Sequence, residues 1–598
     1  MSLELGPREV EVGRAGDGAV LLRSPHPLGP YPGRLTDCLE RAAARFPQRV
    51  FLGVRDANDA WRTITYADAW HAVRCIAGAL LKRALSVERP IAILSGSSIE
   101  HALLALAAML IGVPFAPVSP FYSLSSPDLA KLRHVLALLT PGLVFAQSGS
   151  AFARALCQAV DPGTEIVVQD EPLPDRGTTA FAELVGTEPD HSTAQLIDLQ
   201  HARVGPDTIA KVLFTSGSTG VPKGVINTQR MLCCNQQMFV QALPLAAAEA
   251  PVLVDWLPWH HTSGGNQILG LTLYRAGTLY IDGGRPLPDQ LGPTLRNLRE
   301  ISPTLYFTVP RGYAELIPHL EADAGLRASF FNRVRMFYYS GAPIAHAVVA
   351  RFNEIGERQC GRRIPFLCGY GATETAPFAL CANWLAERSG LAGLPVPGVE
   401  LKLAPRGAKL EACIRGPNVM PGYWRQPELT RAVLDADGFL HTGDALAWVD
   451  EHDPGAGLAF DGRIAEDFKL STGTWVNSGA IRASLIAAAR RSIQDVVIAG
   501  EGRDQVGALI FPDRTQTGCV AAVQQALDQL ASTATGTSTY VARAMLLDEP
   551  PDSPSGEITD KGSINQKAVL SRRAQLVEEL YREPASERVL IAHARRQT

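Results

Sequence analysis

One stretch of this chain sets the expectations for its fold: Phe214-Thr-Ser-Gly-Ser-Thr-Gly-Val-Pro-Lys-Gly224. It follows the apolar run Ala210–Phe214, which predicts a β-strand. Gly217 and Gly220 allow a tight turn that brings backbone N–H groups close to a ligand, and Lys223 adds a cation. Backbone donors and an ammonium suit a polyphosphate, although the G-x-x-G-x-x-K spacing is not that of a Walker loop. The competing interpretation is a flexible Gly/Ser turn.

The composition indicates an ordinary globular protein of more than one domain. The chain has 598 residues, of which 46% are hydrophobic and 19% charged. The net charge of −4 gives no reason to expect nucleic acid or an anionic membrane as a partner. Ten cysteines without a C-x-x-C spacing, and an N-terminus without a signal-peptide pattern, favour reduced thiols in a cytoplasmic protein.

The stretch from His101 to Pro127 lacks charged residues and resembles a membrane span at first sight. Its helical part, Ala102–Ile111, covers only about half of the ~20 residues that a span requires, and Gly112 and Pro114 interrupt the rest. We therefore expect a buried helix that leads into a buried strand, and no membrane span.

Strands and helices alternate along most of the chain, which predicts an α/β architecture with buried, largely parallel sheets. Ile91–Ser95 is a predicted strand that a helix from Ile99 follows. The Pro-, Asp- and Gly-rich residues 171–207 indicate a surface loop, and a single helix is expected over Gln566–Tyr581. Leu394–Leu403 alternates apolar and polar residues between turns, as expected of a small antiparallel subdomain.

Two further stretches combine strand ends with polar and aromatic residues. Val252–Asn266 reads Val-Leu-Val-Asp-Trp-Leu-Pro-Trp-His-His-Thr-Ser-Gly-Gly-Asn, which crowds two histidines and two tryptophans at one turn and favours a pocket wall. Leu367–Pro377 contains Tyr370-Gly-Ala-Thr-Glu374. Taken alone, this second stretch is also compatible with a helix-capping turn.

Together these motifs resemble the adenylate-forming enzymes, a superfamily of acyl-CoA synthetases, non-ribosomal-peptide adenylation domains and luciferases. The resemblance implies that ATP is bound by Thr215, Ser216, Gly217, Ser218, Thr219, Gly220, Lys223, Gly341, Ala342, Tyr370, Gly371, Asp444 and Arg463. It implies catalytic roles for His261 and Thr373, a Mg²⁺ ligand at Glu374, and an acyl pocket flanked by Trp259, His260 and Asn266.

The resemblance also implies the domain organisation. We expect a large N-terminal domain, residues 1–463, of two α/β subdomains and a small antiparallel β subdomain. A small mobile α+β domain, residues 464–598, is expected to carry the lysine that enters the site for adenylation. Lys561 is the candidate and Lys567 the alternative. The hinge is expected at Ala465, Glu466 or Asp467.

Four long phrases are most similar to bacterial feruloyl-CoA synthetases: Val225–Leu232, Asp255–Trp259, Leu279–Gly283 and Gly462–Trp475. This implies ATP-dependent ligation of a small aromatic acid, a hydroxycinnamate such as ferulate, to coenzyme A. Three alternatives stay open: a stand-alone adenylation enzyme that loads a carrier protein, a non-catalytic nucleotide or acyl-CoA sensor, and an oxidative luciferase-like enzyme. The sequence also leaves the choice between a monomer and a homodimer open.

Overall fold

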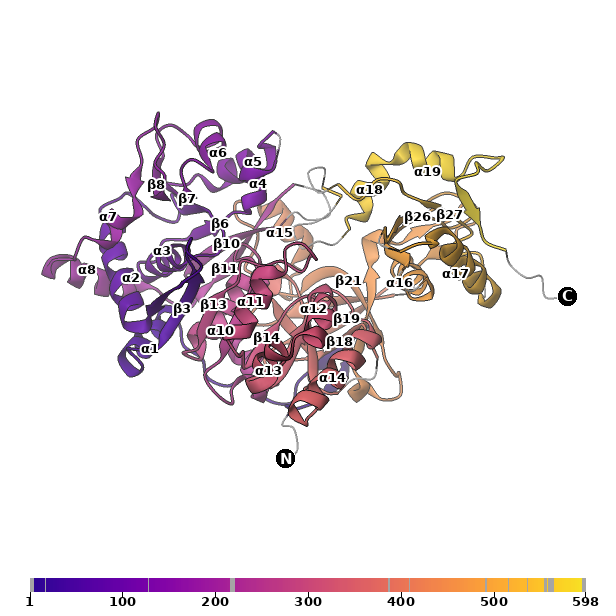
Figure 1. Cartoon of the computed structure of the whole chain (residues 1–598), viewed down its shortest axis with the longest axis horizontal. Coiled ribbons are helices and arrows are strands. Elements are labelled where there is room, and N and C mark those ends of the chain that lie inside the picture. Colours follow the sequence, from indigo (N-terminus) through magenta and orange to yellow (C-terminus); the bar gives the residue numbers. More distant parts are fainter. Residues whose placement is uncertain are drawn as a thin grey trace.

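The computed structural model describes residues 5–16, 18–126, 128–215, 221–385, 388–407, 409–489, 492–514, 516–534, 536–552, 556–557 and 564–593. A large N-terminal part packs beside a smaller C-terminal part, which is drawn in orange and yellow in Figure 1. The predicted mixed α/β fold with a large N-terminal and a smaller C-terminal domain is confirmed.

A seven-stranded sheet carries the stretch that opened the sequence analysis. All of its neighbouring strands are parallel except β10 and β11, which form an antiparallel hairpin at one edge. The order of strands is β11 (Lys223–Thr228), β10 (Ile209–Thr215), β6 (Phe115–Pro117), β5 (Ile91–Leu94), β7 (Leu143–Ser148), β8 (Glu165–Asp170) and β9 (Thr179–Ala180).

The charge-free stretch forms the buried helix α3 (Ile99–Leu110), as expected. The Ser98 side chain caps its N-terminus by accepting a hydrogen bond from the backbone N–H of His101, and every residue of the helix is buried. Among the described residues, no helix is both long and apolar enough to cross a membrane.

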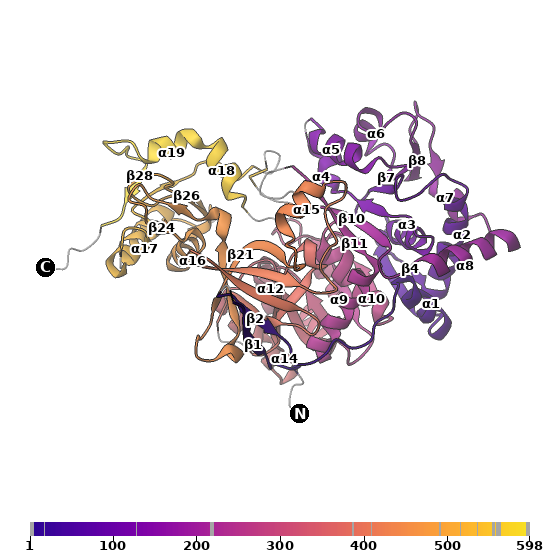
Figure 2. The same ribbon diagram turned by 180° about the vertical axis from the view of Figure 1, so that it is seen from behind.

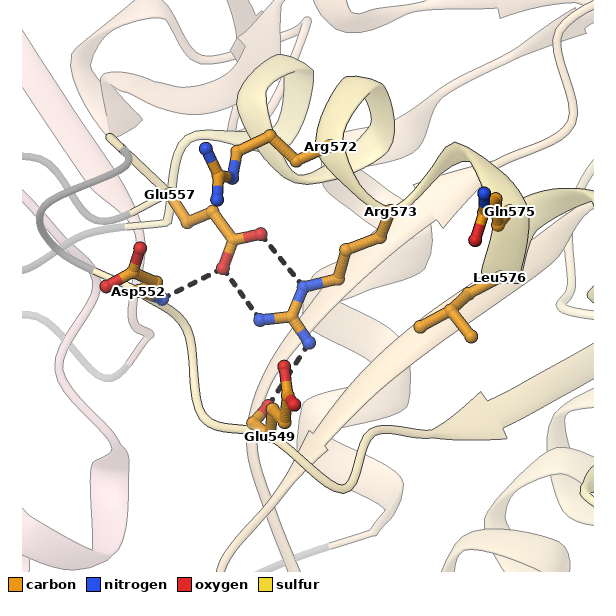
Figure 3. Close-up of a pocket in the computed structure, with 7 residues that line it drawn as sticks. All are labelled: Glu549, Asp552, Glu557, Arg572, Arg573, Gln575 and Leu576. Carbon is orange, nitrogen blue, oxygen red and sulfur yellow. Dashed lines mark hydrogen bonds and ion pairs between the residues drawn. The ribbon is translucent and has the colours of Figure 1, made fainter.

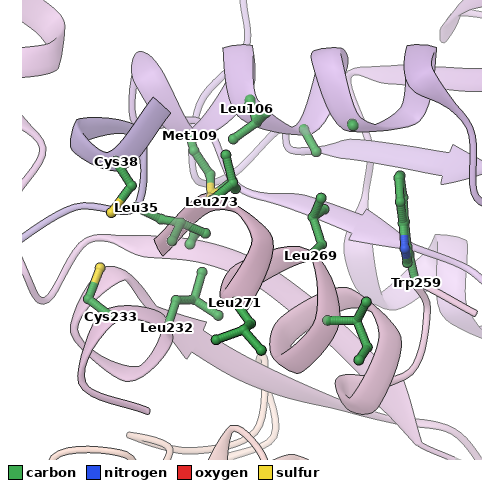
Figure 4. Packing of buried hydrophobic residues seen from close by; sticks show 14 of the residues in the cluster. Leu35, Cys38, Leu106, Met109, Leu232, Cys233, Trp259, Leu269, Leu271 and Leu273 are labelled. Carbon is green, nitrogen blue, oxygen red and sulfur yellow. The ribbon is translucent and has the colours of Figure 1, made fainter. Parts of the chain in front are cut away.

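A four-stranded sheet and several helices enclose the main hydrophobic core. The sheet has the order β12 (Val252–Asp255), β13 (Thr278–Ile281), β3 (Val50–Arg55) and β4 (Trp61–Thr65). Figure 4 shows side chains of α1 (Thr36–Arg45), α3, α9 (Gln229–Ala242) and α10 (Leu269–Tyr274) meeting in this core. Trp259 packs at its edge, so the predicted pocket turn is anchored in the core.

An eleven-stranded sheet contains the predicted antiparallel strands. Three parallel strands, β14 (Leu305–Phe307), β15 (Met336–Tyr339) and β16 (Phe366–Gly371), continue without a break into antiparallel strands. These follow in the order β17 (Phe378–Ala382), β18 (Leu391–Pro395), β22 (Leu458–Arg463), β21 (Leu440–Trp448), β20 (Lys409–Arg415), β19 (Glu400–Arg406), β2 (Val20–Arg23) and β1 (Glu11–Arg14). Figure 2 shows β1 and β2, from the start of the chain, among strands that lie 400 residues later.

Helices cover the outer faces of these sheets. They are α2 (Tyr66–Leu81), α4 (Pro120–Leu124), α5 (Ala130–Leu139), α6 (Ala153–Gln158), α11 (Gly292–Glu300), α12 (Pro310–Ala322), α13 (Ala324–Arg333), α14 (His346–Cys360) and α15 (Pro427–Val433). A cluster of buried aromatic rings, which includes Phe330, Phe337 and Phe352, fixes α13 and α14 against β15.

The C-terminal part has its own sheet and its own cores. The sheet has the order β25 (Ile493–Ala499), β26 (Gly507–Pro512), β27 (Arg543–Leu546) and β28 (Val589–Ile591). The helices α16 (Ser478–Ala488), α17 (Cys519–Thr533), α18 (Gln566–Arg572) and α19 (Ala574–Leu580) pack around it. Two apolar clusters there draw only on residues from Phe468 onwards.

Two expectations were wrong. Residues 171–207 are not a loop, because β9, α7 (Phe181–Val185) and α8 (His191–Arg203) lie within them. Buried Phe181, Leu184 and Ile197 anchor these helices to the core, a tertiary effect that overrides the turn-rich composition. The single helix expected over Gln566–Tyr581 is two helices, α18 and α19, which Arg573 separates.

Replacement of Leu106 by alanine tests the core. Its side chain is fully buried in α3, so we expect Leu106→Ala to lower the free energy of unfolding by about 2–5 kcal/mol. Urea unfolding followed by circular dichroism measures this change. Leu199→Ala on α8 is the matched control: that side chain is half exposed, so an effect within about 0.5 kcal/mol is expected. Equal losses in the two variants would contradict the assignment of the core.

Candidate active site

Strands β10 and β11 flank the predicted phosphate loop and form a hairpin, called the phosphate hairpin below. Thr215, the last residue of β10, pairs in register with Lys223, the first residue of β11. Residues 216–220, five of the predicted ATP-binding positions, lie outside the described residues. The Nζ atom of Lys223 lies 5.3 Å from the centre of the Tyr423 ring, within cation–π range. The hairpin therefore places Lys223 against Tyr423, which is distant in sequence.

Tyr423 connects this lysine to the predicted metal ligand. Its hydroxyl donates a 2.9 Å hydrogen bond to Oε1 of Glu374, which lies in the short 3₁₀ helix η3 (Thr373–Thr375). Buried Thr373 lies beside it in the same helix. Oε2 of Glu374 accepts no hydrogen bond from the described residues. A carboxylate oxygen in this state fits a hard divalent cation such as Mg²⁺.

Two buried asparagines hold η3 in place. The side-chain amides of Asn235, on α9, and Asn418 each donate to the carbonyl oxygens of Thr375 and Phe378. Because α9 directly follows β11, the same chain segment orients both the phosphate hairpin and η3. A Cβ atom on Gly371, just before η3, would lie 1.6 Å from the Pro377 carbonyl oxygen, so only glycine fits there.

A second group of predicted residues meets around Asp444 on β21. The Tyr370 hydroxyl donates a 2.8 Å hydrogen bond to Oδ2 of Asp444, and Nε of Arg463 lies 3.4 Å from Oδ1. Burial raises the pKa of the Tyr370 hydroxyl well above its usual value, so this group remains a donor at neutral pH. Gly341 and Ala342 follow β15 in an exposed turn, where Gly341 has a left-handed φ of 83°. This turn follows the strand next to β16, which carries Tyr370.

The predicted acyl-pocket turn ends in a π-helix, η2 (Ser263–Ile268). Single π-helical turns are frequent at functional sites. The His260 and His261 rings lie 4.4 Å apart between centroids, and the Trp259 ring packs edge-on against His101 at 5.2 Å. Burial lowers the pKa of His260 to about 3, so its ring is neutral at pH 7.

The same turn is bonded to both strands of the phosphate hairpin. Asn266, in η2, donates from Nδ2 to Oδ1 of Asn227 on β11 at 2.7 Å. Lys211, on β10, donates from Nζ to the Gly265 carbonyl oxygen at 2.9 Å. The Trp259–Asn266 turn and the phosphate hairpin therefore form one connected unit.

Lys561, the expected adenylation lysine, lies outside the described residues, but its flanking segments are well anchored. Arg573 donates to both carboxylate oxygens of Glu557, at 2.9 and 2.7 Å, and to the backbone carbonyl of Glu549 (Figure 3). It also donates to the backbone carbonyl of Pro550. The Asn565 backbone N–H donates to the Glu557 carbonyl at 2.8 Å. Residues on both sides of the 558–563 segment are thus tied together. The alternative, Lys567, lies in the first turn of α18.

The three hinge candidates lie where the two parts join. Ala465 and Glu466 are in the 3₁₀ helix η5 (Ile464–Glu466), and Asp467 follows it. Asp467 forms an ion pair with Lys409 on β20 and accepts a hydrogen bond from the Ser478 backbone N–H on α16. Asp467 is therefore bonded to both parts of the chain.

Several of the described residues that the resemblance groups lie close to one another, held by partners that the sequence analysis missed. Lys223 and Glu374 meet through Tyr423, η3 rests on Asn235 and Asn418, and the pocket turn rests on Lys211. A local signal for Tyr423 exists, because it stands in an aromatic Gly422-Tyr-Trp424 sequence that follows Pro421. The other three carry no local signal.

Two models of known families match this chain. Residues 39–424 match the model of the AMP-binding enzyme family, and residues 467–585 match that of the AMP-binding enzyme C-terminal domain.

Individual relatives are more distant. The chain is 25% identical to the peroxisomal long chain acyl-CoA synthetase 6 of Arabidopsis thaliana over 522 residues, which cover 77% of this chain and 71% of that enzyme. It is 32% identical to a feruloyl-CoA synthase of Amycolatopsis sp over 256 residues, only 41% of this chain and 48% of that enzyme. The fold is similar to that of the anthranilate CoA ligase AuaEII in complex with anthranoyl-AMP, with a TM-score of 0.72 at 18% identity over 92% of this chain and 99% of that one.

Replacement of Arg573 tests the anchor next to the lysine segment. Arg573→Met leaves the Glu557 carboxylate buried without its partner, so we expect the C-terminal domain to lose about 3 kcal/mol of stability at pH 7. Hydrogen exchange of β25–β27, followed by mass spectrometry, measures this loss. Arg572→Met is the matched control, because the adjacent arginine is exposed; we expect it to leave the exchange unchanged.

The pH dependence of this loss gives a second test. Burial is the largest influence and raises the pKa of Glu557, but Arg573, the Asp552 backbone N–H and Arg572 together hold that pKa below its usual value. Loss of Arg573 removes the largest of these lowering effects, so the pKa of Glu557 rises. The difference between Arg573→Met and the parent protein should therefore shrink as pH falls and Glu557 takes up a proton. A difference that grows towards acid pH would contradict this account.

Proposed function

The chain belongs to the AMP-binding enzyme family and is an AMP-forming acyl-CoA ligase, and from this premise we propose that it activates a hydroxycinnamate such as ferulate. The acid is first joined to AMP and then transferred to coenzyme A. The observation that carries the proposal is the meeting of Lys223 and Glu374 at Tyr423. The Tyr370–Asp444 hydrogen bond and the bond from the Trp259–Asn266 turn to β11 support it.

The first step joins the acid to AMP. A carboxylate oxygen attacks the α-phosphorus of ATP, the bond from that phosphorus to the bridging oxygen breaks, and pyrophosphate leaves. The loop residues Thr215–Gly220, with Lys223, hold the β- and γ-phosphates and neutralise the leaving pyrophosphate. Positioning and charge stabilisation carry this step, since the protein forms no covalent bond with the substrate.

Other residues fix the nucleotide. Tyr370 and Gly371 line the adenine site together with Gly341 and Ala342, and Thr373 contacts the phosphates. Asp444 binds the ribose hydroxyls and Arg463 assists it. In the present structure Tyr370 and Arg463 already orient the Asp444 carboxylate.

Glu374 would hold Mg²⁺ through the carboxylate oxygen that Tyr423 does not occupy, and the ion would neutralise phosphate charge there. Tyr423 itself fixes the rotamer of Glu374. In this arrangement one side chain orients both the predicted metal ligand and the phosphate lysine.

The second step transfers the acyl group. The thiolate of coenzyme A attacks the acyl carbon, the bond to the AMP oxygen breaks, and AMP leaves. Lys561 serves the first step, and the C-terminal domain, residues 464–598, then rotates about Ala465, Glu466 or Asp467 to withdraw it. This rotation gates access and does no chemistry. His261 lies where the acyl carboxylate and the thiol channel meet.

The choice of an aromatic acid rests on the Trp259–Asn266 turn, which is called the acyl wall below. Trp259, His260 and Asn266 supply ring surfaces and an amide group, and a neutral His260 can donate one hydrogen bond and accept another. The partial similarity to a feruloyl-CoA synthase supports this choice over a fatty acid. A cytoplasmic location completes the proposal.

A panel of acids tests the substrate. With Mg·ATP and coenzyme A, ferulate, coumarate and caffeate should give the thioester and AMP, whereas medium- and long-chain fatty acids should not. Mass spectrometry detects both products. AMP without a thioester would indicate a carrier-protein acceptor, and a thioester from fatty acids alone would overturn the substrate assignment.

Two lysine variants test the catalytic lysine. Lys561→Ala should slow adenylation at least about 100-fold, because charge stabilisation at the reacting phosphorus is lost. It should leave thioester formation from supplied feruloyl-AMP within about twofold. Lys567→Ala, six residues away, is the matched control and should preserve both half-reactions. If Lys567→Ala alone abolishes adenylation, Lys567 and not Lys561 is the adenylation lysine.

A further inference from the structure

Lys211 is a buried lysine whose Nζ is bonded to a backbone carbonyl. Its side chain extends from β10, four residues before the phosphate loop begins, and the residue is 4% exposed. Nζ donates to the Gly265 carbonyl oxygen and lies 5.6 Å from the centre of the Phe115 ring. Among the described residues, no carboxylate lies within ion-pair distance of it.

Stability alone does not account for a lysine at this position. Burial lowers the pKa of Lys211 to about 7, because the protein interior disfavours the ammonium. The neighbouring His101 ring is neutral for the same reason, with a pKa lowered to about 4. An apolar side chain of similar volume would avoid this desolvation entirely. The useful property of Lys211 is therefore its N–H donor.

The Lys211 ammonium donates to the Gly265 carbonyl, which lies in a tightly folded part of the acyl wall. A Cβ atom on Gly264 would lie 2.3 Å from the Leu257 carbonyl oxygen, and one on Gly265 would lie 2.2 Å from that of Trp259. The turn is thus folded back on itself, and the position of Gly265 fixes that of Trp259. A hydrogen bond to the Gly265 carbonyl therefore also restrains Trp259 and the rest of the acyl wall.

The neighbouring residue carries the matching contact. Asn266 donates to Asn227 on β11, while Lys211 on β10 donates to Gly265. Two consecutive residues of η2 are thus bonded to the two strands of the hairpin that flank the phosphate loop. This pair of bonds fixes the acyl wall relative to the phosphates.

We propose that Lys211 is a positioning residue for the carboxylic acid: through the Gly265 carbonyl it sets the distance between the acyl wall and the phosphate hairpin. This inference rests on the proposed function, in which that wall holds the acid. The carboxylate must meet the α-phosphorus at bonding distance, so a displaced wall weakens productive binding of the acid. Nucleotide binding, which uses Lys223 and the Asp444 group, stays intact.

The test is Lys211→Met, which removes the donor and keeps the volume. In acid-dependent ATP–pyrophosphate exchange, we expect the KM for the acid to rise about tenfold and the KM for ATP to stay within twofold. Lys211→Gln, which keeps a neutral N–H donor, should give an intermediate KM for the acid. At pH 7.5 the thermal midpoint of Lys211→Met should be unchanged or higher, because a buried ionisable group is gone.

Lys402→Met is the matched control. Lys402 is a partly buried lysine on strand β19, away from η2. Unlike Lys211, it is paired with a carboxylate: its Nζ lies 3.0 Å from Oδ2 of Asp435. Its loss should lower the thermal midpoint and leave the KM for the acid unchanged.

The outcomes separate the inference from the function. An unchanged KM for the acid in Lys211→Met overturns the inference while the wild-type exchange still supports the proposed function. A lower thermal midpoint with equal rises in both KM values also overturns it, in favour of a general structural role. Wild-type protein without exchange for any acid overturns both.

Discussion

The antiparallel pairing of β10 with β11 is the constraint on which the candidate site depends. Every other neighbour in that sheet is parallel, so this one hairpin reverses the chain at the sheet edge and closes the phosphate loop within a few residues. The register of Thr215 with Lys223 directs the lysine towards Tyr423. Both strands also bond the pocket turn, through Lys211 and Asn227. A shift in this register would displace Lys223 and the Trp259–Asn266 turn together.

Several buried titratable groups lie in the elements that carry the candidate site. His101, Lys211 and His260 are forced towards their neutral forms by burial. Burial also raises the pKa of Asp255, at the end of β12, to about 8. Each group costs stability relative to an apolar side chain, and such costs concentrate where binding or catalysis requires donors and acceptors.

The C-terminal domain joins this site through few polar contacts. Its apolar cores are its own, whereas Lys409 with Asp467 and Asp461 with Asn477 bridge the two parts near the predicted hinge. Polar contacts of this kind exchange readily with water, unlike a shared apolar core. The Glu557–Arg573 pair, by contrast, lies wholly within the domain, so it can hold the lysine segment in any orientation of that domain.

The sequence by itself determined the α/β class and the buried helix at Ile99–Leu110, because hydrophobic periodicity is a local property. The predicted site residues came from the resemblance of short motifs to a known family. Tertiary structure decided the rest. It turned the polar segment 171–207 into helices by burying Phe181, Leu184 and Ile197. It also chose Tyr423, Asn235, Asn418 and Lys211 as partners of the motifs. These contacts join residues far apart in the chain, and no local pattern encodes them, since packing alone decides which distant side chains meet.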